Sequence, residues 1–483
     1  MKKLLFALLL FPLLCNAQTS SQAPQDYVDL VLKASKELQH SAVGLMAVDE
    51  EGNTIARWNS DMRLSTASTM KLVSTGLGLL ALGPGYRYET SLALTGEADA
   101  DGTLHGDIYI IGGGDPTLGS ADEVAVPIDS VFGIWADAIQ ARGISSVEGQ
   151  IVGDARYFAD EMTPGTWEWG DLGYYYGSGT AGLNFAENLS SFEFTPGKAE
   201  GEPVLIRPVA PFSPEMTYLN EATTSAGTGE NIIYETGGIF PVGKFRGTYG
   251  VRRRVDTLNF SNKFPAESCA CAFSEFLAGR GILSDGYSDL ATAAYEEMDV
   301  VCTTYSPELR DIVSVTNHIS NNFFAETIFK SLSKVDSSRT NGSYREASVK
   351  AYLLLGELGP DMSGYKQVDG SGLTARNLAS PRFFCEFLSE MEDSPVFGDF
   401  LSSLPQPGEK GTLKNVLANE KYSVKRKVHA KSGSMTGVKC YAGYVEHNGG
   451  YIKFAVMLNN YTCPNSRIKP LVEGFIASLA HYE

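Results

Sequence analysis

Apolar and polar positions near the start of the chain predict a β-hairpin followed by a helix. Residues 43–48 form a short apolar strand, residues 49–53 a polar turn, and residues 54–58 the returning strand. Over residues 65–82, apolar side chains recur at three- and four-residue intervals, which is the spacing of one helix face. The Gly-Pro-Gly sequence at 83–85 then ends the helical pattern.

The spacing changes between about residue 86 and residue 290. Short alternating stretches such as 88–94 and 107–111 predict strands. Residues 129–142 predict one helix, which Gly143 closes. We therefore expect this part of the chain to be rich in strand.

Helical patterns return after about residue 300, and several of them have recognisable starts. Ser306 followed by Pro307 predicts a helix N-terminus, because proline is favoured at the first helical position. Ser343 and Glu346 form a capping box before an apolar run. Ser380, which precedes a proline, is expected to start another helix.

The end of the chain returns to strand. Residues 438–445 and 451–458 flank a polar turn, and a helix over 468–481 follows. The order sheet, helices, sheet indicates one domain built from both ends of the chain, 24–85 and 291–483. Residues 86–290 are then an inserted, strand-rich region.

Residues 1–17 have the parts of a secretory signal peptide. Lys2 and Lys3 are basic, residues 4–14 are mostly apolar, and small or neutral residues precede a cleavage point before Gln18. The apolar run is too short to span a bilayer as a stable helix. We therefore expect the mature protein to be exported.

Composition narrows the classes that remain. The chain is 43% hydrophobic and 20% charged, as globular proteins are. Its formal net charge of −18 argues against a nucleic-acid partner, because binding phosphates needs a basic face.

The cysteines beyond the signal peptide are Cys269, Cys271, Cys302, Cys385, Cys440 and Cys463. Their even number permits disulfides, but sequence does not choose a pairing. They contain no Cys-x-x-Cys element, and the chain has no His-Glu-x-x-His, so no metal is expected.

Ser68 and Lys71 are the first candidate catalytic pair. A serine hydroxyl is a weak nucleophile until a base takes its proton. If Ser68 starts the predicted helix, Lys71 lies one turn later on the same face. Burial lowers the pKa of a lysine, and the neutral amine can then act as that base. The Ser-x-x-Lys pattern recurs elsewhere in this chain, so alone it is more typical of a capping serine and an exposed lysine than of a catalytic pair.

Two further motifs favour the catalytic interpretation. Residues 320–322 read Ser-Asn-Asn and lie in a polar break between two helical stretches. Residues 431–433 read Lys-Ser-Gly and lie on a strand leading into the C-terminal hairpin. The order Ser-x-x-Lys, Ser-x-Asn, Lys-Ser-Gly is that of the penicillin-recognising serine enzymes.

The flanking sequence resembles the class C low-molecular-mass penicillin-binding proteins, the D-alanyl-D-alanine carboxypeptidase and endopeptidase family. The resemblance runs from about residue 26 to residue 480. Its matching stretches are 67–73, 112–118, 153–154, 174–188, 320–326, 369–373 and 430–437. Two positions depart from the family pattern: Asn321 stands for the usual aspartate, and Ser432 for the usual threonine. Asn321 is expected to point away from the reacting centre, and Ser432 keeps the hydroxyl.

The resemblance implies an α+β fold. Its centre is a penicillin-binding/β-lactamase-like transpeptidase domain, a five-stranded antiparallel sheet flanked by helices. The long strand-rich insertion is expected to form one or two extra domains.

The resemblance also implies four catalytic residues. Ser68 attacks the carbonyl of a D-Ala peptide bond, and Lys71 accepts its proton. Ser320 passes a proton to the departing amine, with Lys431 beside it. No metal or organic cofactor is implied.

Substrate binding is implied for Asn322, Ser432, Gly433 and Ser434. Asn322 hydrogen-bonds the substrate amide, and the hydroxyls of Ser432 and Ser434 bind the terminal carboxylate. The backbone N–H groups of Ser68 and Ser434 form the oxyanion hole.

The implied function is that of a periplasmic serine-type D-Ala-D-Ala carboxypeptidase, DD-endopeptidase or both. Its partners are peptidoglycan stem peptides ending in D-Ala-D-Ala or cross-linked muropeptides, with β-lactams as covalent inhibitors. Peripheral membrane contact and the oligomeric state stay open. The alternatives are a β-lactamase-like hydrolase and a non-catalytic peptidoglycan-binding protein. The first would need a general base for deacylation, and no glutamate motif of that kind is present. The second does not explain why all three motifs keep their reactive side chains.

Overall fold

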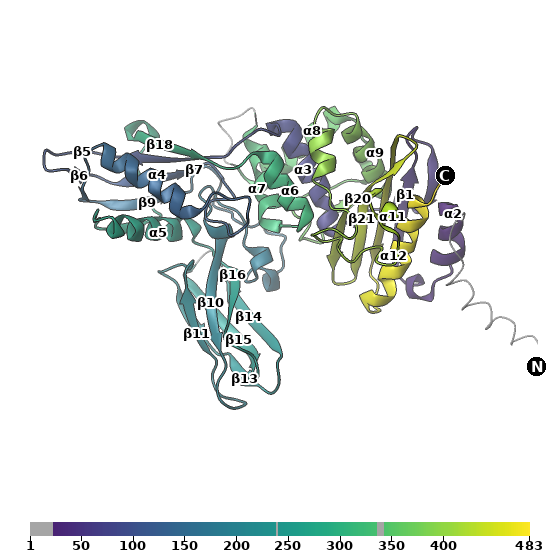
Figure 1. Cartoon of the computed structure of the whole chain (residues 1–483), viewed down its shortest axis with the longest axis horizontal. Helices are drawn as coiled ribbons and strands as arrows, with labels where there is room; N and C mark the ends of the chain where they lie inside the picture. Colours follow the sequence, from purple (N-terminus) through teal and green to yellow (C-terminus); the bar gives the residue numbers. More distant parts are fainter. Residues whose placement is uncertain (1–22, 238–239, 336–341) are drawn as a thin grey trace, which may run out of the picture.

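The computed structural model describes residues 23–237, 240–335 and 342–483 (Figure 1). The predicted signal peptide, residues 1–17, lies outside the described residues. The described chain is elongated, and its first and last helices lie at the same end of the molecule (Figure 1).

A five-stranded antiparallel sheet is built from both ends of the chain, in the order β2-β1-β22-β21-β20. Its strands are β1 (Ala42–Val48), β2 (Thr54–Trp58), β20 (Val428–Met435), β21 (Val438–His447) and β22 (Gly450–Asn459). Both predicted hairpins are therefore confirmed. Alternate side chains enter different cores: Ala442 and Tyr444 pack on one face of the sheet, and Tyr441 and Val445 on the other.

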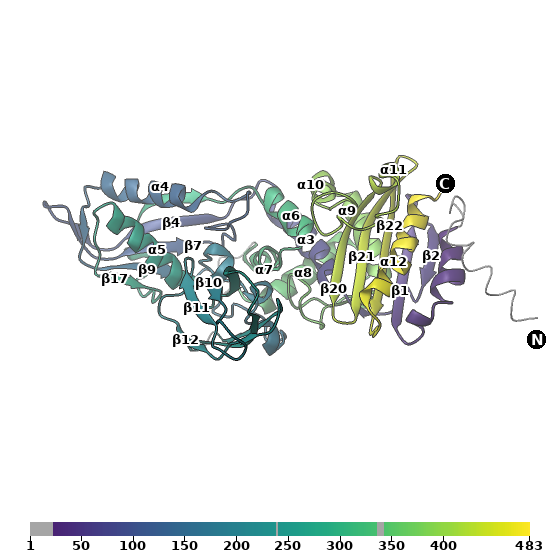
Figure 2. The same cartoon turned by 60° about the horizontal axis from the view of Figure 1, so that its bottom comes forward.

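Helices cover both faces of this sheet (Figures 1 and 2). The larger core lies under α3 (Met70–Leu82), α6 (Leu309–His318), α7 (Asn322–Ser331), α8 (Tyr344–Leu358), α9 (Pro381–Glu392) and α10 (Phe397–Ser402). The other core lies under α2 (Pro24–Tyr27), α11 (Tyr422–Lys425) and α12 (Asn465–Ala480). The predicted α+β fold, with a five-stranded antiparallel sheet flanked by helices, is therefore present.

Two of the three predicted helix starts in the C-terminal half are present in the structure. The Ser343 capping box and the Ser380 cap are confirmed. The predicted start at Ser306 and Pro307 is wrong, because α6 begins two residues later, after Glu308. The Ser306 hydroxyl instead accepts from the backbone N–H of Tyr88, and so serves a contact between segments that are distant in sequence.

The helix predicted over 65–82 also begins later than expected. Residues Leu64–Ser65 form strand β3, which pairs with β19 (Leu378–Ala379). A 3-10 turn over Ala67–Thr69 then leads into α3. Ser68 therefore lies in the turn that precedes the helix.

The inserted region contains a second five-stranded sheet, in the order β17-β9-β7-β4-β18. Its strands are β4 (Glu89–Leu94), β7 (Ile108–Gly112), β9 (Gln150–Asp154), β17 (Gly286–Ser288) and β18 (Asp299–Tyr305). Helices α4 (Ile128–Ala141) and α5 (Pro265–Gly279) pack on one face of it. Beside it lies a small sheet of β5 (Glu97–Ala98), β6 (Thr103–His105) and β8 (Ser146–Val147). Helix α5 is absent from the sequence prediction, which expected one helix here.

The remaining strands of the insertion form a separate projection with its own aromatic core (Figure 1). They are β10 (Leu189–Thr195), β11 (Leu205–Val209), β12 (Thr217–Asn220), β13 (Thr223–Ser225), β14 (Glu230–Thr236), β15 (Val242–Gly250) and β16 (Asp256–Ser261). Phe192, Phe245 and Phe260 lie at the centre of that core. The projection therefore has a buried centre that is distinct from the cores of the two five-stranded sheets.

The predicted return of the chain at residue 291 comes too early. Strand β18 pairs with β4, so residues 299–305 complete the sheet of the inserted region. We place the return after Tyr305, immediately before α6. The boundary of the inserted region is therefore set by the pairing of β18 with β4, two segments that are distant in sequence. A local sequence pattern does not indicate such a pairing.

Candidate active site

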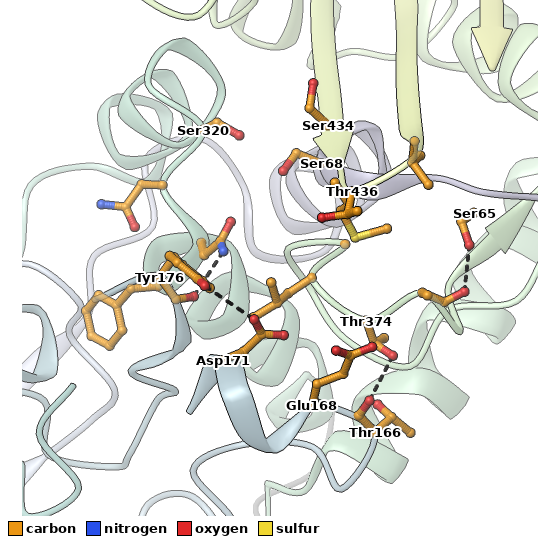
Figure 3. Close-up of a pocket in the computed structure, with 18 of the residues that line it drawn as sticks. Ser65, Ser68, Thr166, Glu168, Asp171, Tyr176, Ser320, Thr374, Ser434 and Thr436 are labelled. Atoms are coloured by element: carbon orange, nitrogen blue, oxygen red, sulfur yellow. Dashed lines mark hydrogen bonds between the residues drawn. The ribbon is translucent and has the colours of Figure 1, made fainter. Parts of the chain in front are cut away.

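A cavity of about 980 Å³ lies where the inserted region meets α7 and strand β20 (Figure 3). The predicted site residues that line it are Ser68, Ser320, Asn322 and Ser434. Lys71 and Lys431 are fully buried, and each contacts one of these serines from within the protein. Ser432 and Gly433 lie on β20 between Lys431 and Ser434 but do not line the cavity.

Ser68 is held in a strained turn against strand β20. The preceding residue, Ala67, has a left-handed backbone with φ of 44°, which is unfavourable for any residue except glycine. A Cβ added at Gly433 would lie 2.9 Å from the backbone nitrogen of Ser68. Only glycine therefore lets β20 come this close to the turn, and the closeness sets the Ser68 N–H beside the strand.

Lys71 lies one turn beyond Ser68, and its Nζ is within hydrogen-bond distance of three oxygens. They are the Ser68 hydroxyl at 3.1 Å, the side-chain oxygen of Asn322 at 2.7 Å and the carbonyl of Ser371 at 2.8 Å. Burial lowers the pKa of Lys71 to about 7, although the nearby carboxyls of Glu326 and Asp369 oppose that effect. The amine is therefore available in its neutral form near physiological pH.

The second motif forms the link between α6 and α7. Ser320 has a left-handed backbone, φ 62°, which places its hydroxyl 2.9 Å from the Nζ of Lys431. Asn322 is the first residue of α7, and its side-chain amide donates to the carbonyl of Tyr176 over 3.0 Å. The link therefore contacts both buried lysines and the inserted region.

Asn321 has a structural role at this link. Its side-chain oxygen accepts from the backbone N–H of Phe324 and caps α7. Its amide nitrogen donates to Glu187 of the inserted region over 2.9 Å. An aspartate here would place two carboxylates together, so asparagine suits this contact.

Lys431 is buried on β20 and donates to the Ser320 hydroxyl and to the carbonyl of Ser432, each over 2.9 Å. Burial lowers the pKa of Lys431 well below its usual value, and the nearby charge of Lys71 lowers it further. Two like charges this close disfavour simultaneous protonation, which favours at least one neutral amine in the site.

Two buried carboxyls, Glu326 and Asp369, position the loop that carries Ser371, and neither is among the predicted site residues. Glu326 accepts from the backbone N–H groups of Gly370 and Ser371, each over 2.8 Å. Asp369 accepts from the indole of Trp167 at 2.9 Å and from neighbouring backbone N–H groups. Burial beside Asp369 raises the pKa of Glu326 to about 8. The available signal was the resemblance of 320–326 and 369–373 to family stretches, which gives no reason for either residue.

The inserted region supplies an acidic wall of the cavity, opposite Ser68 and Ser434 (Figure 3). Glu168 and Asp171 lie on this wall, and the Tyr176 hydroxyl donates to Asp171 over 3.3 Å. Glu168 and Asp171 fall outside every stretch that pointed to the family, so sequence reasoning had no signal for them.

Within the described ranges, no group of three or more His, Cys, Asp or Glu side chains is arranged to hold a metal ion. The six cysteines from Cys269 to Cys463 all have free thiols, so the disulfides that their number permits are not formed. No helix in the described part of the chain has both the length and the apolar character that crossing a membrane requires.

The fold and the three motifs define a serine peptidase of the penicillin-binding class. The sequence model of the D-Ala-D-Ala carboxypeptidase 3 (S13) family matches residues 25–474. The chain belongs to this family.

Named relatives agree with that assignment. A D-alanyl-D-alanine carboxypeptidase of Actinomadura sp. strain R39 is 26% identical over 455 residues, which cover 90% of this chain and 81% of the relative. The crystal structure of penicillin binding protein 4 (dacB) from Haemophilus influenzae has a TM-score of 0.80 and 22% identity, and covers 94% of this chain and 98% of that one. The same protein in complex with a β-lactam has a TM-score of 0.76 at 20% identity, and covers 95% and 98%. These structures show the shared fold.

Proposed function

We propose that this enzyme cleaves the peptide bond that follows D-Ala in peptidoglycan, through an acyl-enzyme on Ser68. Its substrates are stem peptides ending in D-Ala-D-Ala, cross-linked muropeptides, or both. The membership of the S13 family supports the substrate class. The predicted N-terminal leader supports export to the periplasm, where that substrate occurs.

The hydrogen bonds of Lys71 are the observation that carries this proposal. Two of its three partners, the oxygens of Asn322 and Ser371, can only accept. A neutral amine has two hydrogens, and these two acceptors use both. The amine lone pair is then directed at the third partner, the Ser68 hydroxyl, at 3.1 Å. This is the arrangement that a general base needs in order to take the serine proton.

Acylation follows from these contacts. The Ser68 oxygen bonds to the substrate carbonyl carbon as its proton passes to Lys71. The N–H groups of Ser68 and Ser434 receive the developing oxyanion, which preorganised donors stabilise. The C–N bond then breaks, and the departing amine takes the proton of the Ser320 hydroxyl, whose oxygen is reprotonated by Lys431. Because Lys431 donates to the Ser320 oxygen, the serine's own hydrogen is free for that transfer.

Substrate binding uses the remaining polar groups. Asn322 has a second amide hydrogen beyond the one that Tyr176 accepts, and this hydrogen, which has no acceptor among the described residues, can bind a substrate carbonyl. The hydroxyl of Ser434, which lines the cavity, binds the terminal carboxylate, and Ser432 lies two residues earlier on the same side of β20. Water then attacks the ester carbonyl and the ester C–O bond breaks. Ser68 regains its proton from Lys71, and the proton that the water loses returns to Lys431. A β-lactam that acylates Ser68 would block the same steps.

Digestion of purified muropeptides, followed by liquid chromatography, tests this function. Wild type should shorten pentapeptides by one D-Ala, cut cross-linked dimers, or do both, and Ser68→Ala should do neither. A wild type that cuts nothing, while Ser68→Ala binds cell wall equally well, would favour the non-catalytic alternative.

A further inference from the structure

Strand β20 presents two hydroxyls on one side, and a lysine of the next strand lies beside them. Ser432 and Ser434 are two residues apart and so point to the same face of the sheet. Lys439 lies directly opposite Ser434 in the β20–β21 pairing. Its Nζ donates to the Ser434 hydroxyl oxygen over 2.8 Å.

This hydrogen bond fixes what Ser434 can offer to a ligand. A lysine ammonium only donates, so the Ser434 oxygen is the acceptor and its own hydrogen is directed elsewhere. That hydrogen has no acceptor among the hydrogen bonds of the described residues, and Ser434 is exposed in the cavity. Ser434 therefore presents an O–H donor, polarised by a cation, to whatever enters the cavity.

Lys439 has no carboxylate partner of its own in the described part of the chain. Its Nζ lies 5.0 Å from the ring centre of Tyr441, and burial lowers the pKa of the side chain. Glu473 on α12 favours the charged form, but its carboxylate is paired with Lys469 at 3.4 Å. A half-buried cation beside a substrate cavity, without an ion-pair partner, is a site for an anion.

We propose that Lys439 recognises the carboxylate on the leaving residue of the substrate, acting directly and through the Ser434 hydroxyl. This inference rests on the proposed function and specifies which bonds the enzyme prefers. The leaving amine should be attached to a carbon atom that also carries a free carboxylate. A terminal D-Ala meets this condition, and so does a cross-link formed by an amine next to a carboxylate. A cross-link formed by a simple alkyl amine does not.

The test compares an acyl-D-Ala-D-Ala peptide that has a free C-terminal carboxylate with its C-terminal amide. Wild type should prefer the acid by about 10- to 100-fold in kcat/KM, the usual effect of one hydrogen-bonded charge. Lys439→Met keeps the length of the side chain and its packing on Tyr441. It should lose that preference, so that kcat/KM for the acid falls to the value for the amide. Lys439→Arg, which keeps the charge, should retain most of the preference.

Lys469→Met is the matched control, because it removes a neighbouring positive charge that does not contact Ser434. It should leave the ratio of acid to amide unchanged. Equal losses on both substrates in Lys439→Met, or a preserved preference, would overturn the inference.

If wild type cleaves neither peptide, the proposed function fails. The carboxylate inference is then tested separately, by comparing the rate at which benzylpenicillin acylates Ser68 with the rate for its methyl ester. A preference for the free acid that disappears in Lys439→Met supports the inference, and equal rates in wild type contradict it.

Discussion

The side-chain amide of Asn322 donates to the backbone carbonyl of Tyr176, and this 3.0 Å hydrogen bond joins the Ser-x-Asn motif to the inserted region. It also fixes the orientation of the Asn322 amide, so that the oxygen faces Lys71. The inserted region therefore helps to set the hydrogen bonds of Lys71, the proposed catalytic base, in addition to forming a wall of the cavity.

Lys263 is expected to maintain that orientation. It is buried after β16 and donates to the carbonyls of Gly177 and Ser178, over 2.8 and 3.2 Å, immediately beyond Tyr176. Lys263→Met leaves both carbonyls unpaired and frees the turn. Because small displacements of reacting groups are costly, we expect the rate of Ser68 acylation by benzylpenicillin to fall about 10- to 100-fold.

Lys330→Met is the control for that variant. Lys330 is also buried and also donates to two backbone carbonyls of the inserted region, those of Ala159 and Glu161. It should lower the melting temperature by a similar amount and leave the acylation rate within about threefold of wild type, since its carbonyls are remote in sequence from Tyr176. Equal acylation rates in the two variants would show that the effect of Lys263 is one of stability alone.

Acylation should depend on the protonation of Lys71, whose pKa burial lowers to about 7. Only the deprotonated amine can accept the Ser68 proton. The acylation rate should therefore rise about tenfold per pH unit below pH 7 and level off above it. Stopped-flow measurements with a chromogenic β-lactam across this range give the profile. A rate that is flat through pH 7, or that rises as the pH falls, is incompatible with Lys71 as the base.

Gly433→Ala should remove activity with only a modest loss of stability. The added methyl group would lie 2.8 Å from the carbonyl oxygen of Thr66 and 2.9 Å from the nitrogen of Ser68, so β20 must move away from the turn. That movement displaces one of the two proposed oxyanion donors, and we expect kcat to fall about 100- to 1,000-fold. Gly398→Ala, which meets no atom within 4 Å, should behave as wild type. A Gly433→Ala enzyme with near-normal kcat would show that the close approach of β20 is dispensable.

The sequence predicted those structural features that are set by residues close together in the chain. In the Ser343 capping box, a side chain and its backbone partner lie three residues apart. In the hairpin that contains Lys439, a short turn joins the two paired strands. The three catalytic motifs were also readable, since each combines a few residue types at a fixed spacing.

Structural features that depend on contacts between residues distant in the sequence were not predicted. The Ser306 hydroxyl is used by Tyr88, so its apparent capping role fails. Strand β18 belongs to the inserted region only because it pairs with β4. Tyr176 matters through a backbone carbonyl, which no side-chain pattern reveals. Glu168 and Asp171 enter the cavity because the insertion folds back over it.

The most direct test of the account is mass spectrometry of the protein after exposure to benzylpenicillin. Wild type should gain one long-lived adduct, which peptide mapping places on Ser68, and Ser68→Ala should gain none. An adduct on another residue, an adduct that persists in Ser68→Ala, or rapid hydrolysis of the drug without accumulation would contradict Ser68 as the nucleophile of a D-Ala-D-Ala peptidase.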